Sequence, residues 1–205
     1  MNGRVRVFTR FAILLAIEAI VCFTPLGSLP AWGPIVATLG MIPVIITAQT
    51  LGTGAGSLMG LFAGIFSMCV WTFMPPNPVS AFVFTPFAEF AGVSGGIRSV
   101  FICIVPRVLV GTVAGLSLKF FKSTSIDERV GYAISGFLGS MVNTILVMGG
   151  IYVLFGKLYA ESLGVEFGIL MGLIWTTVLT SGIPEAVLGA VSGMFVSRPI
   201  NKYIR

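Results

Sequence analysis

The sequence predicts an all-α integral membrane protein, with six transmembrane helices in one compact bundle. Of its 205 residues, 56% are hydrophobic and only 9% are charged, whereas soluble domains carry about a quarter charged residues. The apolar residues also form separate stretches, each close to the roughly 20 helical residues that cross a bilayer. A single domain over residues 1–205 is the natural size for such a bundle.

The predicted spans are joined by connections of very different lengths. Residues 51–54, Leu-Gly-Thr-Gly, allow only a tight hairpin between the second and third helices, whereas residues 74–98 form a long connection. Arg4 and Arg6 precede the first stretch, which we interpret as a membrane span because no small-residue cleavage site follows it. The six predicted spans cover residues 6–23, 34–51, 54–73, 99–121, 130–155 and 167–197.

Lysine and arginine are divided unevenly between the two ends of the predicted bundle. Nine of the 12 basic residues fall at the termini or between the fourth and fifth helices, and only Arg98 and Lys157 fall on the opposite side. Because basic loops remain in the cytoplasm, we expect both termini to be cytoplasmic and the protein to lie in the cell membrane. The net charge of +5 therefore reflects topology, and nucleic-acid binding is not expected.

Several classes of function lack the residues they need. The chain has no histidine, the commonest general base and metal ligand, and its three cysteines have no paired spacing. It also has no Gly-x-x-x-x-Gly-Lys-Ser/Thr phosphate loop and no row of carboxylates for proton transfer across a bilayer. We therefore expect no enzyme activity, no metal and no cofactor, and concentrative uptake would need a partner.

Arg107 is the most unusual residue of the predicted spans. It lies about 13–14 Å into the fourth helix, near the bilayer middle, where a buried guanidinium needs an anion or carbonyl groups. The adjacent Pro106 leaves the carbonyl near Ile102 without its helical donor. Arg107 therefore either contacts an anionic ligand or forms an ion pair within the protein. As its ion-pair partner we favour Glu185, because Glu18 is expected nearer the outer rim.

Further polar and aromatic residues predict a small-molecule pocket that opens outward. Asn143 has four hydrogen-bonding sites and is seldom placed in hydrocarbon without a partner, whereas membrane hydroxyls mostly bond the backbone. Aromatic rings near the outer loops can stack on a flat ligand, although an interfacial belt also accounts for Trp32 and Trp71. The candidate ligand-binding residues are Arg107, Asn143, Trp71, Phe82, Phe84, Trp175, Glu185 and Arg98.

Glycines recur at a spacing of four residues, which places them on one face of a helix. Such strips let membrane helices approach closely, and we interpret them as packing surfaces rather than ligand sites. The glycines concerned are Gly52, Gly56, Gly60 and Gly64, and the pairs Gly111/Gly115, Gly168/Gly172 and Gly189/Gly193.

Five short motifs and the glycine-rich third helix stand in a characteristic order along the chain. The motifs are Thr24-Pro-Leu-Gly27, Ala37-Thr-Leu-Gly-Met-Ile-Pro-Val-Ile45, Phe82-Val-Phe-Thr-Pro86, Pro106-Arg-Val-Leu-Val-Gly111 and Ile183-Pro-Glu185. In their order and spacing, over nearly the whole chain, they resemble the substrate-binding S components of energy-coupling factor (ECF) vitamin transporters.

The resemblance implies that the protein binds a vitamin near the outer face of the membrane. It also implies partnership with a transmembrane T component and two cytoplasmic ATPases, whose ATP cycle drives uptake. In that family an Ala-x-x-x-Ala face of the first helix docks on the T component. Ala12 and Ala16 match this face and Ala19 extends it, with packing inside the S component as the alternative.

The pattern from Thr38 to Val44 is similar to the branch that includes pantothenate, cobalamin and vitamin B6 binders. Met41 replaces the histidine usual in that pattern. Because an anionic ligand would pair with Arg107 or Arg98, we place pantothenate first, with vitamin B6, cobalamin and riboflavin as alternatives. From a different class, a self-sufficient ion-coupled transporter or channel is the second hypothesis, and a membrane enzyme is the third.

Overall fold

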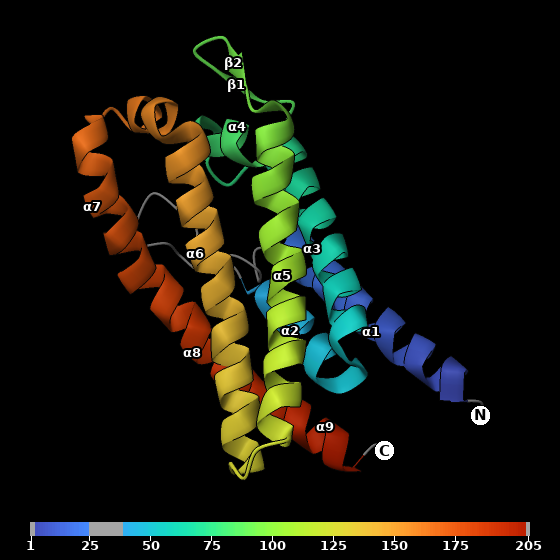
Figure 1. The fold of residues 1–205 in the computed structure, drawn as a ribbon. Coiled ribbons are helices and arrows are strands. Elements are labelled where there is room, and N and C mark those ends of the chain that lie inside the picture. The colour runs from blue at the N-terminus through green and yellow to red at the C-terminus, as the bar shows by residue number, and fades with distance from the viewer. Residues whose placement is uncertain (1–2, 25–38, 204–205) are drawn as a thin grey trace.

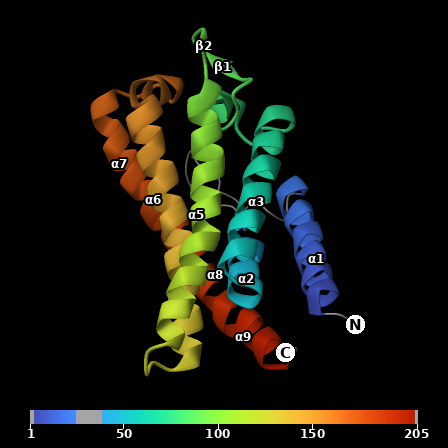
Figure 2. The ribbon, with the colours of Figure 1, turned by 45° about the vertical axis from the view of Figure 1, so that its right-hand side comes forward.

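The computed structural model describes residues 3–24 and 39–203, and nearly all of them are helical. The helices stand side by side in one bundle (Figures 1 and 2). The first turn of α1, the last turn of α9 and the turn between α5 and α6 all lie toward the same end of this bundle. The long elements are α1 (Gly3–Phe23), α2 (Met41–Leu51), α3 (Thr53–Phe73), α5 (Gly96–Lys122), α6 (Glu128–Ser162) and a last helix containing α7 (Phe167–Thr177), α8 (Ile183–Ser192) and α9 (Arg198–Tyr203).

Within residues 3–24 and 39–203, four helices are long and apolar enough to cross a membrane, and they confirm four of the six predicted spans. These helices cover Thr53–Phe73, Gly96–Lys122, Glu128–Ser162 and the continuous stretch Phe167–Tyr203. By contrast, α1 is long enough to cross a membrane, with 21 residues. It is not among these four helices because it contains three arginines and Glu18.

The second predicted span, 34–51, is only partly helical in the described chain. Its helix begins at Met41 after a turn at Leu39 and Gly40, and it has 11 residues, a length of about 16 Å. Residues 34–38 lie outside the described part, as do Trp32 and most of the first outward loop. The short α2 therefore starts inside the bundle rather than at its surface (Figure 2).

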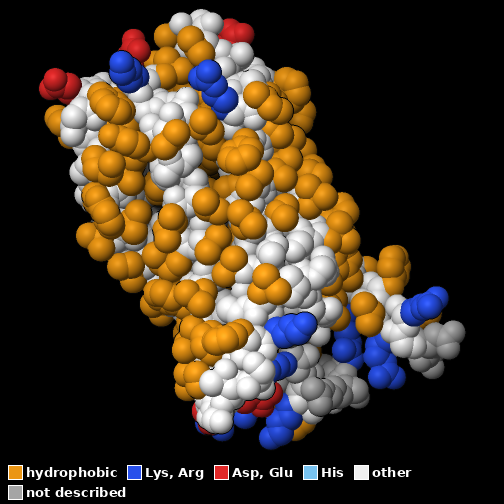
Figure 3. All heavy atoms as spheres, viewed as in Figure 1, with side chains coloured by type: hydrophobic (Ala, Val, Ile, Leu, Met, Phe, Trp, Pro, Cys, Tyr) orange, Lys and Arg blue, Asp and Glu red, His pale blue; other side chains and the backbone are white. Residues whose placement is uncertain are grey.

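On the face of the molecule shown in Figure 3, apolar side chains cover the middle and charged side chains gather at the two ends. Large side chains such as Phe101, Val153 and Phe195 are between 58% and 77% exposed. A contiguous apolar band of this kind is unfavourable in water and suits contact with lipid acyl chains.

The glycine strip of α3 packs directly on α5, as the spacing predicts. A methyl group at Gly60 would collide with the backbone carbonyl of Arg107, and one at Gly64 would lie 3.0 Å from the Ile104 Cα. Only glycine permits this approach of two backbones. Gly52 does not belong to the strip, because it ends α2 with a φ of +99° and is exposed.

The other predicted glycine pairs divide into two groups. Gly189 packs against Gly136 of α6, so this contact joins the last helix to α6. A methyl group at Gly168 or Gly172 would meet no atom within 4 Å, so the predicted packing surface of these two glycines has no described helix over it.

The long connection at 74–98 is an ordered cap that closes one end of the bundle. It contains the short helices η2 (Pro78–Ser80) and α4 (Ala81–Phe84) and a small hairpin of β1 (Glu89–Phe90) and β2 (Val93–Ser94), which the all-α prediction did not include. The buried Ser99 hydroxyl donates to the Phe82 carbonyl at 2.6 Å, which fixes α4 to the first turn of α5.

Two π-helical segments interrupt the last helix, η3 (Val178–Gly182) and η4 (Gly193–Ser197). Each ends two residues before a proline, Pro184 or Pro199. Proline clashes with the carbonyl four residues earlier and cannot donate to it, and a widened turn accommodates both effects. The helix therefore continues through both prolines and remains a single element from Phe167 to Tyr203.

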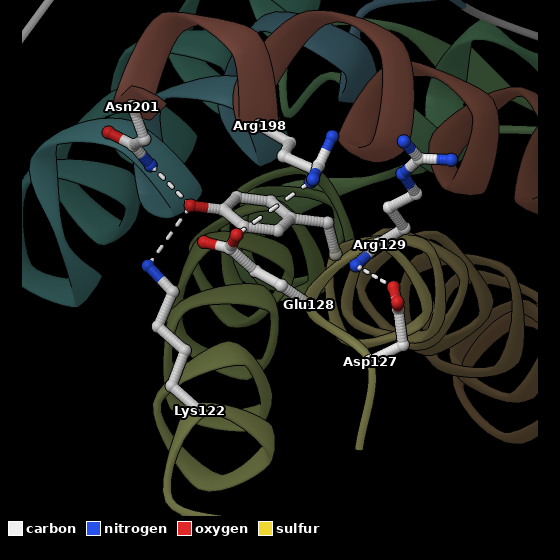
Figure 4. A network of polar contacts seen from close by, with 7 residues as sticks. Lys122, Asp127, Glu128, Arg129, Arg198 and Asn201 are labelled. Atoms are coloured by element: carbon white, nitrogen blue, oxygen red, sulfur yellow. Dashed lines mark hydrogen bonds and ion pairs between the residues drawn. The ribbon is translucent and has the colours of Figure 1, made fainter. Parts of the chain in front are cut away.

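At the end that holds the termini, a polar network joins four helices. Figure 4 shows the part of it that links α5, α6 and α9. The Tyr132 hydroxyl of α6 accepts from Lys122 of α5 at 3.0 Å and from Asn201 of α9 at 2.7 Å. Asn201 also donates to the Gln49 carbonyl of α2, while the Gln49 amide donates to Tyr132 O and to Ser135. This network fixes the carboxyl end of α2 against the neighbouring helices.

Candidate functional site

Arg107 lies inside α5 with only 6% of its surface exposed. Its Nη1 donates to the Ile102 carbonyl at 2.9 Å. Ile102 stands four residues before Pro106, so this is the carbonyl that the proline leaves without a helical donor. The guanidinium thus replaces the missing backbone amide, and α5 passes through Pro106 without interruption. The Arg107 Nε is buried and has no hydrogen-bond partner among the described residues.

Two close contacts between α5 and α6 define the level of Arg107 in the bundle. On one side of it, a methyl group at Gly150 would lie 3.1 Å from the Ile102 side chain. On the other side, a methyl group at Gly139 would lie 3.3 Å from the Val110 carbonyl oxygen. The stretch of α6 between these glycines therefore lies at the level of Arg107.

That stretch of α6 carries three buried polar side chains, Ser140, Asn143 and Thr144. Their exposed fractions are 1%, 7% and 4%. The Ser140 hydroxyl, the Asn143 Oδ1 and the Thr144 hydroxyl each lack a hydrogen-bond partner in the described structure. A buried polar group without a partner costs about 1–3 kcal/mol, so three of them at the level of a buried guanidinium mark this region as the candidate site for a polar ligand.

The last helix contributes its first π-helical segment at the same level. Gly182 packs against Thr144, so η3 faces the polar stretch of α6. Ser181 is buried here, and Glu185 follows in the first turn of α8 as a half-buried side chain. Glu185, which the sequence favoured as the ion-pair partner of Arg107, thus lies on α8. The Arg107 Nη1 donates to the Ile102 carbonyl.

Glu18 is the residue that sequence reasoning underrated. It is fully buried, and the positive charge of Arg107 acts favourably on its carboxylate. Its position could not be read from the sequence because it depends on where α2 starts: Gly40, at the amino end of α2, lies beside the Glu18 carboxylate. We call the following five residues the polar cluster: Glu18, Arg107, Ser140, Asn143 and Thr144.

Of the predicted aromatic residues, Phe82 and Phe84 lie in the cap, whereas Trp71 belongs to the last turns of α3 and packs against the cap. Trp71 stacks on Phe84 with ring centroids 4.5 Å apart, and Phe82 stacks on Phe90 at 5.6 Å. Phe82 and Phe84 are only 1% and 3% exposed. These rings therefore pack on one another, and form an apolar cover at one end of the bundle.

Two other predicted binding residues point away from the polar cluster. Trp175 is 61% exposed on the outer surface of α7, and Arg98 is exposed in the first turn of α5. The structure therefore does not bring them to Arg107. A tryptophan on a lipid-facing surface serves an aromatic belt equally well.

The alanines of α1 lie on a face that the bundle leaves open. Ala12 and Ala16 are exposed and Ala19 is half-buried, whereas Phe11 on another side of the helix contacts Phe62 of α3. This smooth face is available for close contact with another helix.

A bundle of membrane helices with a capped polar interior defines a membrane protein that binds a small polar molecule. Its fold is similar to that of a crystal structure of the S component for biotin from an ECF-type ABC transporter, with a TM-score of 0.54 and 16% sequence identity. The likeness covers 97% of this chain and 95% of that one.

Residues 6–197 match the family model of the ECF transporter substrate-specific component, and the protein belongs to that family. It is also 31% identical over 187 residues to the pantothenic acid transporter PanT of Lactococcus lactis subsp. cremoris, which covers 87% of this chain and 92% of that protein. The chain is therefore a multi-pass protein of the cell membrane and a substrate-binding component of a vitamin transport system.

Proposed function

We propose that this protein binds pantothenate for ATP-driven uptake. The observation that carries the proposal is Arg107, a buried guanidinium whose Nε keeps an unused donor at the level of a row of unpartnered polar groups. Guanidinium donors match a carboxylate in charge and geometry. The 31% identical relative is a pantothenic acid transporter, which supports the same substrate.

The remaining polar groups of the cluster suit the rest of this ligand. Pantothenate carries one carboxylate, two hydroxyls and one amide. The Asn143 Oδ1 can accept from a hydroxyl or amide, and the hydroxyls of Ser140 and Thr144 can donate or accept. A ligand that satisfies these groups offsets the cost of burying them, which favours it over ligands without matching groups.

Within the membrane, we propose one domain of six spans with both termini in the cytoplasm. The basic residues at the end that holds the termini support this orientation, because nine of 12 belong to that end. A T component and two ATPases would supply the energy, with the exposed Ala12 and Ala16 of α1 as the contact for the T component.

The substrate proposal is tested by isothermal titration of the purified protein in detergent. Pantothenate is expected to bind, whereas pantothenol, in which a hydroxymethyl group replaces the carboxylate, is expected to bind at least about 10-fold more weakly. Equal affinity for the two compounds would exclude the carboxylate role of Arg107. Binding of another vitamin, with no binding of pantothenate, would exclude pantothenate as the substrate.

The energy source is tested by reconstitution in liposomes. Pantothenate uptake is expected only when the T component, both ATPases and ATP are present. Uptake by this chain alone, driven by an ion gradient, would favour a self-sufficient transporter. Replacement of Ala16 by tryptophan is expected to prevent assembly with the T component, and the same replacement at the exposed Ile169 of α7 serves as the control.

A further inference from the structure

Glu18 is buried at a position where a carboxylate is costly. Its exposed fraction is 0%, although Ile17 and Ile20 beside it on α1 are 43% and 55% exposed. Moving a carboxylate out of water carries a large penalty unless charged or hydrogen-bonding groups compensate. The helix therefore turns its only acidic side chain into the bundle, against its own stability.

The described protein uses only part of the hydrogen-bonding capacity of this carboxylate. Oε1 accepts a weak bond from the Cys22 thiol at 3.2 Å. Oε2 is buried and has no hydrogen-bond partner among the described residues. A carboxyl group has two oxygens with two lone pairs each, so most of its hydrogen-bonding capacity remains unused.

Two further features offset part of the cost of burying Glu18 without occupying its free oxygen. The amino end of α2 lies beside it, since a methyl group at Gly40 would stand 3.5 Å from Oε1, and this end of a helix carries partial positive charge. Arg107 interacts with it through charge, while the Arg107 hydrogen bond to the protein goes to Ile102. Both arrangements leave Oε2 able to accept from another molecule.

We infer that Glu18 is a ligand-binding residue that accepts hydrogen bonds from the hydroxyl or amide donors of the transported molecule. Arg107 binds the anionic group of the same molecule, so the two residues together select a ligand with an acid at one place and hydrogen-bond donors at another. This inference rests on the proposed function, because it assigns Glu18 to the same site. Pantothenate has the required chemistry, whereas a simple carboxylic acid without donors does not.

The assignment explains why the site discriminates between related acids. A ligand that lacks donors leaves the Glu18 carboxylate buried without a partner, which weakens its binding relative to a ligand that supplies them. An interaction with a charged acceptor corresponds to about 10- to 100-fold in affinity.

The test compares the wild type with Glu18→Gln by isothermal titration with pantothenate. Glutamine keeps the shape of the side chain but loses its charge and one acceptor, so the Kd is expected to rise about 10- to 100-fold. Thermal unfolding without ligand is measured in parallel, and the variant is expected to be as stable as the wild type or more stable. Glu161→Gln, a change of an exposed carboxylate, serves as the matched control and is expected to leave the Kd unchanged.

An unchanged Kd for Glu18→Gln in a protein that binds pantothenate would overturn the inference and leave the proposed function intact. A large loss of ligand-free thermal stability with an unchanged Kd would show that Glu18 holds the bundle together, and would also overturn it. If Glu18→Gln does not fold, the test uses Glu18→Asp, which keeps the carboxylate but moves it away from the ligand by one methylene group. This variant must then bind pantothenate more weakly than the wild type.

Failure of the proposed substrate gives a different result. A wild type that does not bind pantothenate is then screened by thermal shift with riboflavin, pyridoxine and cobalamin. A vitamin that the wild type binds, and that Glu18→Gln binds at least about 10-fold more weakly, supports the role of Glu18 with another substrate. Absence of binding to all of these compounds overturns both proposals.

Discussion

The hydrogen bond between Arg107 and the Ile102 carbonyl makes a prediction about Pro106. In the Pro106→Ala variant the new backbone amide can donate to Ile102, four residues earlier, as in an ordinary helix. Arg107 is then no longer needed for this carbonyl. Replacement of Arg107 by methionine should therefore destabilise the protein less when residue 106 is alanine than when it is proline.

The size of the effect follows from the kind of hydrogen bond. A bond from a charged donor contributes about 1.5–3 kcal/mol in proteins, whereas side-chain bonds between membrane helices average about 0.6 kcal/mol. Because the Arg107 donor is charged, 6% exposed and 2.9 Å from the carbonyl, we expect a coupling free energy of about 1–2 kcal/mol. The single variant Arg107→Met is less informative, since it also removes a buried charge.

The measurement is a double-mutant cycle on the free energy of unfolding. Wild type, Pro106→Ala, Arg107→Met and the double variant are unfolded with sodium dodecyl sulfate from mixed micelles, without ligand. Independent sites add within about 0.3–0.5 kcal/mol. A coupling free energy inside that range would refute the view that Arg107 replaces the missing amide.

Three other changes test the packing of the fold. Gly60→Ala should cost about 1–3 kcal/mol in unfolding free energy, because the methyl group collides with a backbone carbonyl of α5, whereas Gly149→Ala, with no described atom within 4 Å, should cost nothing. Tyr132→Phe should cost about 1–2 kcal/mol in the same measurement, since two donors lose their shared acceptor. Ser99→Ala should speed hydrogen exchange in α4, measured by mass spectrometry, because it removes the bond to the Phe82 carbonyl. Unaltered stability of Gly60→Ala or Tyr132→Phe, or unaltered exchange in α4 of Ser99→Ala, would contradict the contacts described.

The features predicted correctly from sequence are those that depend on neighbouring residues of one helix. Counting back four residues from Pro106 identifies the carbonyl that loses its helical donor. In the structure, the Arg107 Nη1 donates to that carbonyl. The strip of Gly56, Gly60 and Gly64 was likewise readable, because the absence of Cβ atoms on one face defines a surface before its neighbour is known.

The features missed depend on how separate helices meet. Lipid is as apolar as the interior of the bundle, so the hydrophobic pattern of a span does not show which face points outward. For this reason Trp175 could be assigned to a pocket although it is 61% exposed. Gly168 and Gly172 repeat the spacing of the α3 strip without a neighbour. The burial of Glu18 depends on the short α2, whose start inside the bundle has no signature in composition.

The polar network around Tyr132 has a consequence for how this family can change its substrates. It anchors the carboxyl end of α2 at the end of the bundle that holds the termini, while the amino end of the same helix reaches Glu18. Contacts that maintain the fold and the groups that we propose recognise the ligand are thus separated along the bundle axis. Mutations at one level can alter recognition while the other level preserves folding, so new specificities are accessible to evolution and to design without rebuilding the scaffold.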